Sequence, residues 1–169
     1  MASTKPYFCA LIVLLGASGV FCSPLKDFFE SVRKDPLTTY QCYRNGSSLE
    51  DPSAIKLSVS WSGSGLPDHK VDCIVSFSLP GSEGKKTFHV SAEYVPQKDY
   101  VILTAGEKNV NLHLLDAPYN GKAYFFKQVD TSTGDESFKI YDISATCENA
   151  HALRKIICTE PCGLQNTAQ

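Results

Sequence analysis

The sequence predicts an all-β protein: an eight-stranded antiparallel up-and-down barrel with a short helix before it and another helix after it. Two observations predict this fold class. Eight segments in which apolar and polar residues alternate follow one another, about one per dozen residues, with short connections rich in turn residues. Helical spacing of apolar residues occurs only before the first of these segments and after the last. A β-sandwich would share the alternation and is the competing architecture.

The first residues have the layout of a secretory signal peptide. A positively charged start precedes an apolar run over residues 7–15, and small residues follow it. Cleavage after Gly19 and cleavage after Cys22 both fit this layout. We prefer the second, which gives a signal peptide of residues 1–22 and one domain of residues 23–169. The apolar run is too short to cross a membrane as a helix, so we expect a secreted, soluble protein without a membrane partner.

Two segments have the spacing of amphipathic helices. Residues 24–36 lie between two prolines and place apolar side chains at positions i, i+3, i+4 and i+7. Residues 147–158 repeat such a spacing before Pro161 ends the pattern. The apolar positions are Leu25, Phe28, Phe29 and Val32 in the first segment and Ala150, Leu153 and Ile157 in the second.

The eight strand candidates lie between these helices. The clearest are 73–79 and 88–95, which alternate strictly on either side of a turn between Gly81 and Gly84. This pattern predicts a hairpin with one apolar and one polar face. In chain order the candidates are 38–44, 54–61, 73–79, 88–95, 99–105, 109–116, 122–130 and 137–144.

A closed eight-stranded barrel encloses a space that its own side chains or one small ligand can fill. The side chains that we expect to face this space are largely apolar and aromatic, as those of an ordinary core also are. The interior candidates are Tyr40, Leu57, Val59, Trp61, Val75, Phe77, Phe88, Val90, Tyr94, Leu112, Leu114, Tyr124, Phe126 and Ile140. We expect a ligand to contact Tyr40, Trp61, Phe77, Phe88, Tyr94, Leu112, Tyr124, Phe126 and Asp142.

Two carboxylates share a face with apolar neighbours. Asp116 shares one with Leu114, and Asp142 shares one with Ile140. A carboxylate inside a barrel is costly unless a cation or a hydrogen-bond donor meets it, and a bound amine would do so. A position at a strand end, near water, would also account for either carboxylate.

The cysteines favour an oxidising compartment, in which disulfides are the default. We expect at least one bridge from the segment 147–162 to Cys42 or Cys73, because closing so long a loop stabilises the fold by about 4 kcal/mol. The sequence Asn45-Gly46-Ser47 is an N-glycosylation sequon, which makes Asn45 the predicted sugar site. The disulfide candidates are Cys42, Cys73, Cys147, Cys158 and Cys162, an odd number that leaves one thiol over, whereas cleavage after Gly19 would retain Cys22 as a sixth and allow full pairing.

Several kinds of chemistry have no support in the sequence. The net charge of −2 and the interspersed charges argue against nucleic acid as a partner. The stretch SWSGSGLP has Ser62 where a hydrolase nucleophile motif needs its first glycine. No phosphate-binding glycine loop and no metal-ligand spacing are present, and we expect neither an enzyme nor a cofactor. The scattered histidines are His69, His89, His113 and His151.

The chain resembles the lipocalins, and within them the divergent salivary group of ticks that includes histamine-binding proteins. The signal peptide, the order of elements and the clustered cysteines near the C-terminus carry this resemblance, together with YQCYRN over 40–45, the central hairpin and the last strand running into Cys147. The first strand lacks the Gly-x-Trp of most lipocalins, since the only tryptophan is Trp61. The resemblance implies a secreted salivary protein that sequesters a biogenic amine, such as histamine, or a lipid mediator.

Binding of a small molecule is therefore the first function that the sequence predicts, in a pocket whose aromatic walls remove water from the ligand. The alternative is a secreted β-barrel or β-sandwich that recognises a host protein through its surface, as an inhibitor or immunomodulator. An immunoglobulin-type sandwich lacks support, because Cys147 has no tyrosine two residues before it.

Overall fold

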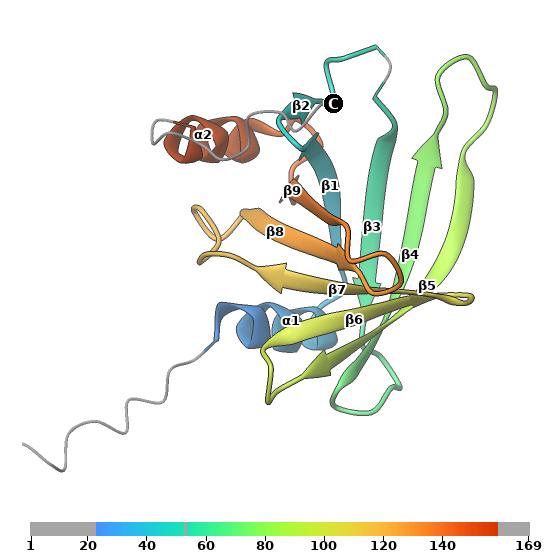
Figure 1. Ribbon diagram of the computed structural model, residues 1–169, viewed down its shortest axis with the longest axis vertical. Coiled ribbons are helices and arrows are strands. Elements are labelled where there is room, and N and C mark those ends of the chain that lie inside the picture. Colours follow the sequence, from blue (N-terminus) through green and yellow to red (C-terminus); the bar gives the residue numbers. More distant parts are fainter. Residues whose placement is uncertain (1–22, 53, 159–169) are drawn as a thin grey trace, which may run out of the picture.

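A closed antiparallel barrel forms the body of the computed structural model, which describes residues 23–52 and 54–158 (Figure 1). The predicted signal peptide and Cys162 lie outside the described residues. Each strand pairs with the next one along the ring, and pairing of β1 with β9 closes it. The eight-stranded ring confirms the predicted fold class. The elements are α1 (Pro24–Lys34), β1 (Leu37–Arg44), β2 (Ser47–Ser48), β3 (Lys56–Ser62), β4 (Lys70–Ser78), β5 (Lys86–Val95), β6 (Tyr100–Ala105), β7 (Lys108–Leu114), β8 (Ala123–Asp130), β9 (Glu136–Asp142) and α2 (Glu148–Ile157).

The predicted strands overlap the eight strands of the ring. The largest difference is at the start of β4, which begins at Lys70 where the pattern predicts residue 73. The two-residue strand β2 pairs only with β1 and has no counterpart in the sequence prediction.

A β-bulge in β1 changes which side chains of this strand face inward. Gln41 pairs with Tyr141, but the next pairs are Tyr43 with Ile140 and Arg44 with Lys139. One extra residue therefore lies on β1 between Gln41 and Tyr43. Because paired residues point to the same side of a sheet, the bulge places Arg44 on the inner face with Lys139.

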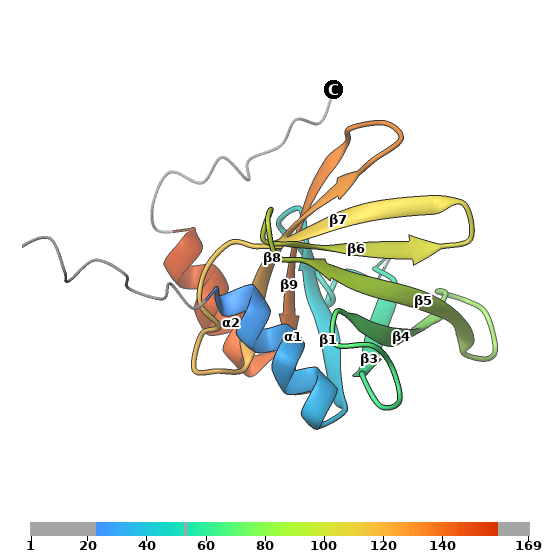
Figure 2. The ribbon, with the colours of Figure 1, turned by 90° about the horizontal axis from the view of Figure 1, so that it is seen from below.

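Helix α1 closes one end of the barrel (Figure 2). The Ser23 hydroxyl accepts a hydrogen bond from the Lys26 backbone N–H at 3.3 Å, and Pro24 occupies the first turn, where its missing N–H costs nothing. The predicted apolar face is buried, and its Phe28 ring contacts the rings of Trp61 and Tyr124 at centroid distances of 5.3 and 4.8 Å. This end of the barrel, hereafter the closed end, is consequently filled by protein side chains.

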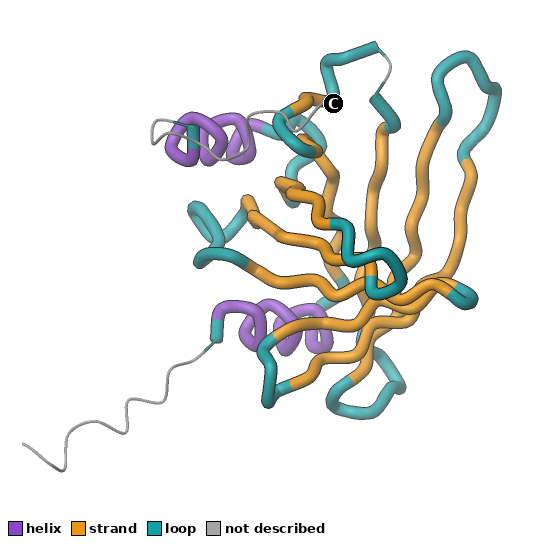
Figure 3. Tube along the Cα trace, in the orientation of Figure 1, coloured by secondary structure: helices purple, strands orange, loops and turns teal. Residues whose placement is uncertain are grey.

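Helix α2 packs against the outside of the barrel, beside β1, β8 and β9 (Figure 3). Its Ala150 and Leu153 join a second apolar cluster with Tyr43, Ala123 and Ile140. The disulfide Cys42–Cys147 ties the start of the helix to β1 and confirms the predicted bridge from the C-terminal segment. The helix thus covers the outer face of the strands that close the ring.

Candidate ligand site at the open end of the barrel

The end of the barrel opposite α1, hereafter the open end, exposes apolar side chains on its inner face. Leu57 and Phe77 face inward from β3 and β4, and Leu103 and Ala105 face inward from β6, all only partly buried. Phe88 on β5 pairs with Val75, and 41% of its surface is exposed although it lies on the inner face. We call Leu57, Phe77, Phe88, Leu103 and Ala105 the apolar wall.

The opposite side of the open end is polar and positively charged. Arg44 and Lys139 are paired residues on β1 and β9, and the Lys139 ammonium donates a hydrogen bond to the Gln128 side-chain oxygen on β8. Below them the Tyr141 hydroxyl donates to the Gln41 side-chain oxygen at 3.4 Å. We call Gln41, Arg44, Gln128, Lys139 and Tyr141 the cationic wall.

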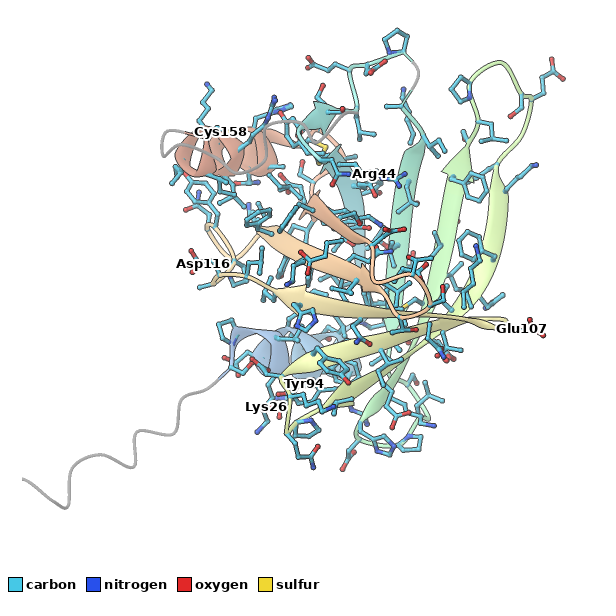
Figure 4. The ribbon with its side chains drawn as sticks, viewed as in Figure 1. Lys26, Arg44, Tyr94, Glu107, Asp116 and Cys158 are labelled. Carbon is cyan, nitrogen blue, oxygen red and sulfur yellow. A yellow bond between two sulfur atoms is a disulfide. The ribbon has the colours of Figure 1, made fainter. Side chains whose placement is uncertain are left out.

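Neither positive charge of the cationic wall is neutralised by a neighbouring carboxylate. Within 23–52 and 54–158, no ion pair involves Arg44 or Lys139. Burial and the positive charge of Arg44 lower the pKa of Lys139 to about 8. Burial also raises the pKa of Tyr141, which keeps its hydroxyl neutral. In Figure 4 the labelled Arg44 lies at the end of β1 away from α1.

Five of the nine predicted ligand contacts lie deeper and contribute to a packed core. Trp61 faces inward as predicted, with 4% of its surface exposed, and its indole N–H donates to the Thr39 hydroxyl at 3.1 Å. The Tyr94 hydroxyl donates to the Asp99 carboxylate at 3.0 Å, next to α1. These five residues pack with the apolar face of α1, and they are Trp61, Tyr94, Leu112, Tyr124 and Phe126.

Two other predicted contacts, Tyr40 and Asp142, face away from the interior. They are paired residues of β1 and β9, on the face opposite to Gln41 and Tyr141. The fully buried Asp142 carboxylate accepts hydrogen bonds from the backbone N–H groups of Ser144 at 2.8 Å and Ala150 at 2.9 Å. Asp142 therefore caps α2 and is not available to an amine inside the barrel. Ile140, predicted to face inward, packs with Ala150 and Leu153 of α2 on the outer face of β9.

The other candidate carboxylate, Asp116, is exposed beyond the end of β7. It accepts a hydrogen bond from the Ala117 backbone N–H at 2.7 Å, and Figure 4 shows it at the edge of the molecule. This placement matches the strand-end alternative. Of the nine predicted contacts, only Phe77 and Phe88 line the open end.

The residues of the cationic wall were missed because β9 has apolar side chains on both faces. In FKIYD over 138–142, alternation offers Phe138 and Ile140 on one face and Lys139 and Tyr141 on the other. The apolar character of the first set predicts that it faces inward, but in the structure it packs under α2 or on the outside. A one-residue shift in this choice inverts the whole strand.

A groove near the disulfide lies mainly on the outer face of the barrel. This outer groove has a volume of about 440 Å³ and runs over β1, β3 and β4 to the start of α2. Its lining includes Tyr40, Leu49, Ser58, Ser76, Thr146 and His151, together with Leu57 and Phe77 of the apolar wall.

The remaining cysteines and the sequon occupy distinct environments. The Cys73 thiol is buried in the core, where burial and the negative charge of Asp72 raise its pKa. The Cys158 thiol is exposed at the end of α2 and unpaired within the described part of the chain. Asn45 is exposed, and its side-chain oxygen accepts a hydrogen bond from the Phe138 backbone N–H at 2.8 Å. Glycosylation of Asn45 stays a prediction.

In the described ranges, no group of three or more His, Cys, Asp or Glu is placed to hold a metal ion. No helix in these ranges has the length and apolar character that crossing a bilayer requires.

Comparison with known proteins identifies the fold. No family model and no curated protein sequence matches this chain. Among solved structures, a siderocalin, Ex-FABP, described as functioning through dual ligand specificities, matches with a TM-score of 0.51 and 11% identity over 73% of this chain and 85% of its own. An odorant binding protein, OBP1, matches with a TM-score of 0.43 and 16% identity over 77% of this chain and 84% of its own. The chain therefore has the lipocalin fold, and its resemblance to tick salivary proteins stays a prediction.

Proposed function

We propose that this protein binds a small molecule with an apolar body inside the open end of its barrel and thereby lowers the free concentration of that molecule. The exposure of the apolar wall carries the proposal. Phe88 faces the interior, yet 41% of its surface is in contact with solvent, and Phe77 lies edge-on to it at 5.8 Å. A ligand that covers such side chains gains about 25 cal/mol for each Å² of apolar surface removed from water.

The charges of the interior favour a lipid mediator over a biogenic amine. An amine would need a carboxylate on the inner face. The two candidates are placed elsewhere, since Asp142 caps α2 and Asp116 is exposed beyond β7. Asp130, at the end of β8 on the inner face, accepts hydrogen bonds from the backbone N–H groups of its own turn, and the inner face also presents Arg44 and Lys139.

Binding and release need no covalent chemistry. The packed closed end, with Phe28 against Trp61 and Tyr124, supplies a rigid floor, so a ligand would enter and leave through the open end. The signal-peptide pattern and the Cys42–Cys147 disulfide support action outside the cell. A lipocalin fold is compatible with such a role, although a fold does not by itself determine function.

A fluorescent fatty acid tests this proposal. Cis-parinaric acid, whose emission increases in apolar surroundings, should bind the purified protein and reach saturation. In the variant Ala105→Trp a large ring is added to the apolar wall, and binding should be lost. The matched control is Thr104→Trp, on the outer face of the same strand, which should bind the probe like the wild type. Equal binding by both variants, or no saturable binding by the wild type, would contradict the proposal.

Recognition of a host protein is a second candidate function, favoured by the outer groove. The groove has a volume of about 440 Å³, is open to solvent and is lined mainly by outward-facing residues, although it also contacts Leu57 and Phe77 of the apolar wall. In the variant Ser58→Arg a charged side chain is added to the groove floor while the inner face of β3 is unchanged. If the protein acts through this groove, the variant should lose inhibition of the host protein and keep binding of cis-parinaric acid. If Ser58→Arg keeps its effect on the host while Ala105→Trp loses it, the barrel interior is the functional site.

A further inference from the structure

We propose that Arg44 and Lys139 bind the anionic headgroup, a carboxylate or a phosphate, of a single-chain lipid whose apolar chain lies on the apolar wall. This inference rests on the function proposed above and specifies the class of ligand. Its basis is the position of two positive charges on the inner face of the open end.

The backbone places both side chains on the same inner surface. Lys139 pairs with Arg44 on one side and with Phe126 on the other, and Phe126 belongs to the barrel core. Without the bulge that follows Gln41, Arg44 would face outward and Tyr43 would face inward. The bulge is thus the local feature that brings the guanidinium to Lys139.

The two cations have no anionic partner in the described part of the chain. The Lys139 ammonium donates to the amide oxygen of Gln128, which leaves its positive charge uncompensated. Arg44 forms no hydrogen bond or ion pair through its guanidinium among residues 23–52 and 54–158. Lys139 is partly removed from water beside the positive charge of the exposed Arg44, which lowers stability, and a bound anion would offset that cost.

The donors that face this space suit an anion. The planar guanidinium of Arg44 can donate two parallel hydrogen bonds to a carboxylate or a phosphate, and the Lys139 ammonium supplies a third donor. The apolar wall rises from β3 to β6 on the opposite side, and the cationic wall comes from β1, β8 and β9. The open end therefore has an apolar side and a cationic side, which match the apolar chain and the anionic head of a single-chain lipid.

The groups that face Lys139 define how its charge would respond to pH. Arg44 and Gln41 come from β1, Gln128 from β8, and Tyr141 from β9 itself. Among these groups, burial raises the pKa of Tyr141 and keeps its hydroxyl neutral, so Lys139 is the group whose charge changes with pH. Its pKa of about 8 means that the free protein loses this positive charge between pH 7 and pH 9.5.

Three probes of equal chain length test the headgroup site by displacement of cis-parinaric acid: dodecanoate, dodecyl phosphate and dodecan-1-ol. At pH 7 we expect both anionic probes to bind at least about tenfold more tightly than the alcohol, a difference of about 1.4 kcal/mol. The tighter of the two anions identifies the headgroup. The affinity for dodecanoate should fall between pH 7 and pH 9.5, and the affinity for the alcohol should not.

Variants assign the effect to the two residues. Arg44→Gln and Lys139→Gln should each weaken dodecanoate about tenfold and leave the alcohol unchanged. The matched control is Lys127→Gln, on the outer face of β8 where Lys127 pairs with Glu136 at 3.1 Å, and it should affect neither probe. Circular dichroism checks that each variant is folded.

The outcomes separate this inference from the proposed function. If all three probes bind with equal affinity and neither variant changes it, the headgroup site is refuted and the proposed function stands. If no probe binds to the wild type, the proposed function itself fails.

Discussion

Removal of the Cys42–Cys147 disulfide should lower the free energy of unfolding by about 4.8 kcal/mol. The bridge joins residues separated by 105 positions. On the loop-entropy model, opening a loop of that length returns about 16 cal/mol/K of chain entropy to the unfolded state, or about 4.8 kcal/mol at 25 °C. For a domain of this size, such a loss corresponds to a decrease of about 15 °C in Tm. The variant to test is Cys42→Ala/Cys147→Ala.

Urea denaturation, followed by far-UV circular dichroism and by the emission of the buried Trp61, measures the loss. The matched control is Cys158→Ser, which removes an exposed thiol at the end of α2 and should change the free energy of unfolding by less than about 0.5 kcal/mol. Reduction of the wild type should reproduce the double variant. Helix α2 keeps the hydrogen bond from the Ala150 backbone N–H to Asp142, so native helix content should persist in the double variant. A loss below about 2 kcal/mol would show that the long loop does not dominate the unfolded-state entropy.

Three further substitutions test contacts at both ends of the barrel. Asp142→Ala should lower the free energy of unfolding by about 1–3 kcal/mol in urea denaturation, because the backbone N–H groups of Ser144 and Ala150 lose their acceptor. The control Asp116→Ala, at an exposed site, should lower it little, and equal losses would contradict the capping role. Gly63→Ala should cost about 1–3 kcal/mol, because a Cβ at Gly63 would lie 2.5 Å from Arg33 Cγ and 2.7 Å from Arg33 Cα, and an unchanged Tm would refute this close approach. Lys139→Met should gain about 1–3 kcal/mol at pH 7, because the fold lowers the pKa of Lys139 from 10.5 to about 8 and so disfavours its charged form. Between pH 8 and pH 10.5 the unfolded wild type holds a proton that the folded wild type has released, so the stability of the wild type should rise with pH. The advantage of Lys139→Met should therefore shrink over this range, and an advantage independent of pH would count against the lowered pKa of Lys139.

Much of the fold could be predicted from local patterns. The apolar spacing of Leu25, Phe28, Phe29 and Val32 specifies the buried face of α1, and the two prolines limit its length. Strict alternation in β4 and β5 specifies both the hairpin and its inner face, as Val75 and Val90 show. Trp61 was assigned to the interior on the same grounds, and it lies there.

The candidate site depended on information that a single strand does not contain. Asp142 and Ile140 were expected inside, but α2 offers a second apolar surface on the outside of β9, and the free N–H groups at its start attract the carboxylate. The strand patterns also do not determine how much of the barrel interior is filled by side chains, because Phe28 comes from a helix outside the ring and occupies the closed end.

The sequence by itself determined the order of the elements, the faces of the strongly alternating strands and the pairing of the C-terminal segment with an early cysteine. Only the tertiary structure decided that Arg44 and Lys139 share the interior. The physical reason is that alternation repeats every two residues, so it determines that a strand has two faces. Which face turns inward depends on what packs against each, and for Arg44 also on one extra residue in β1.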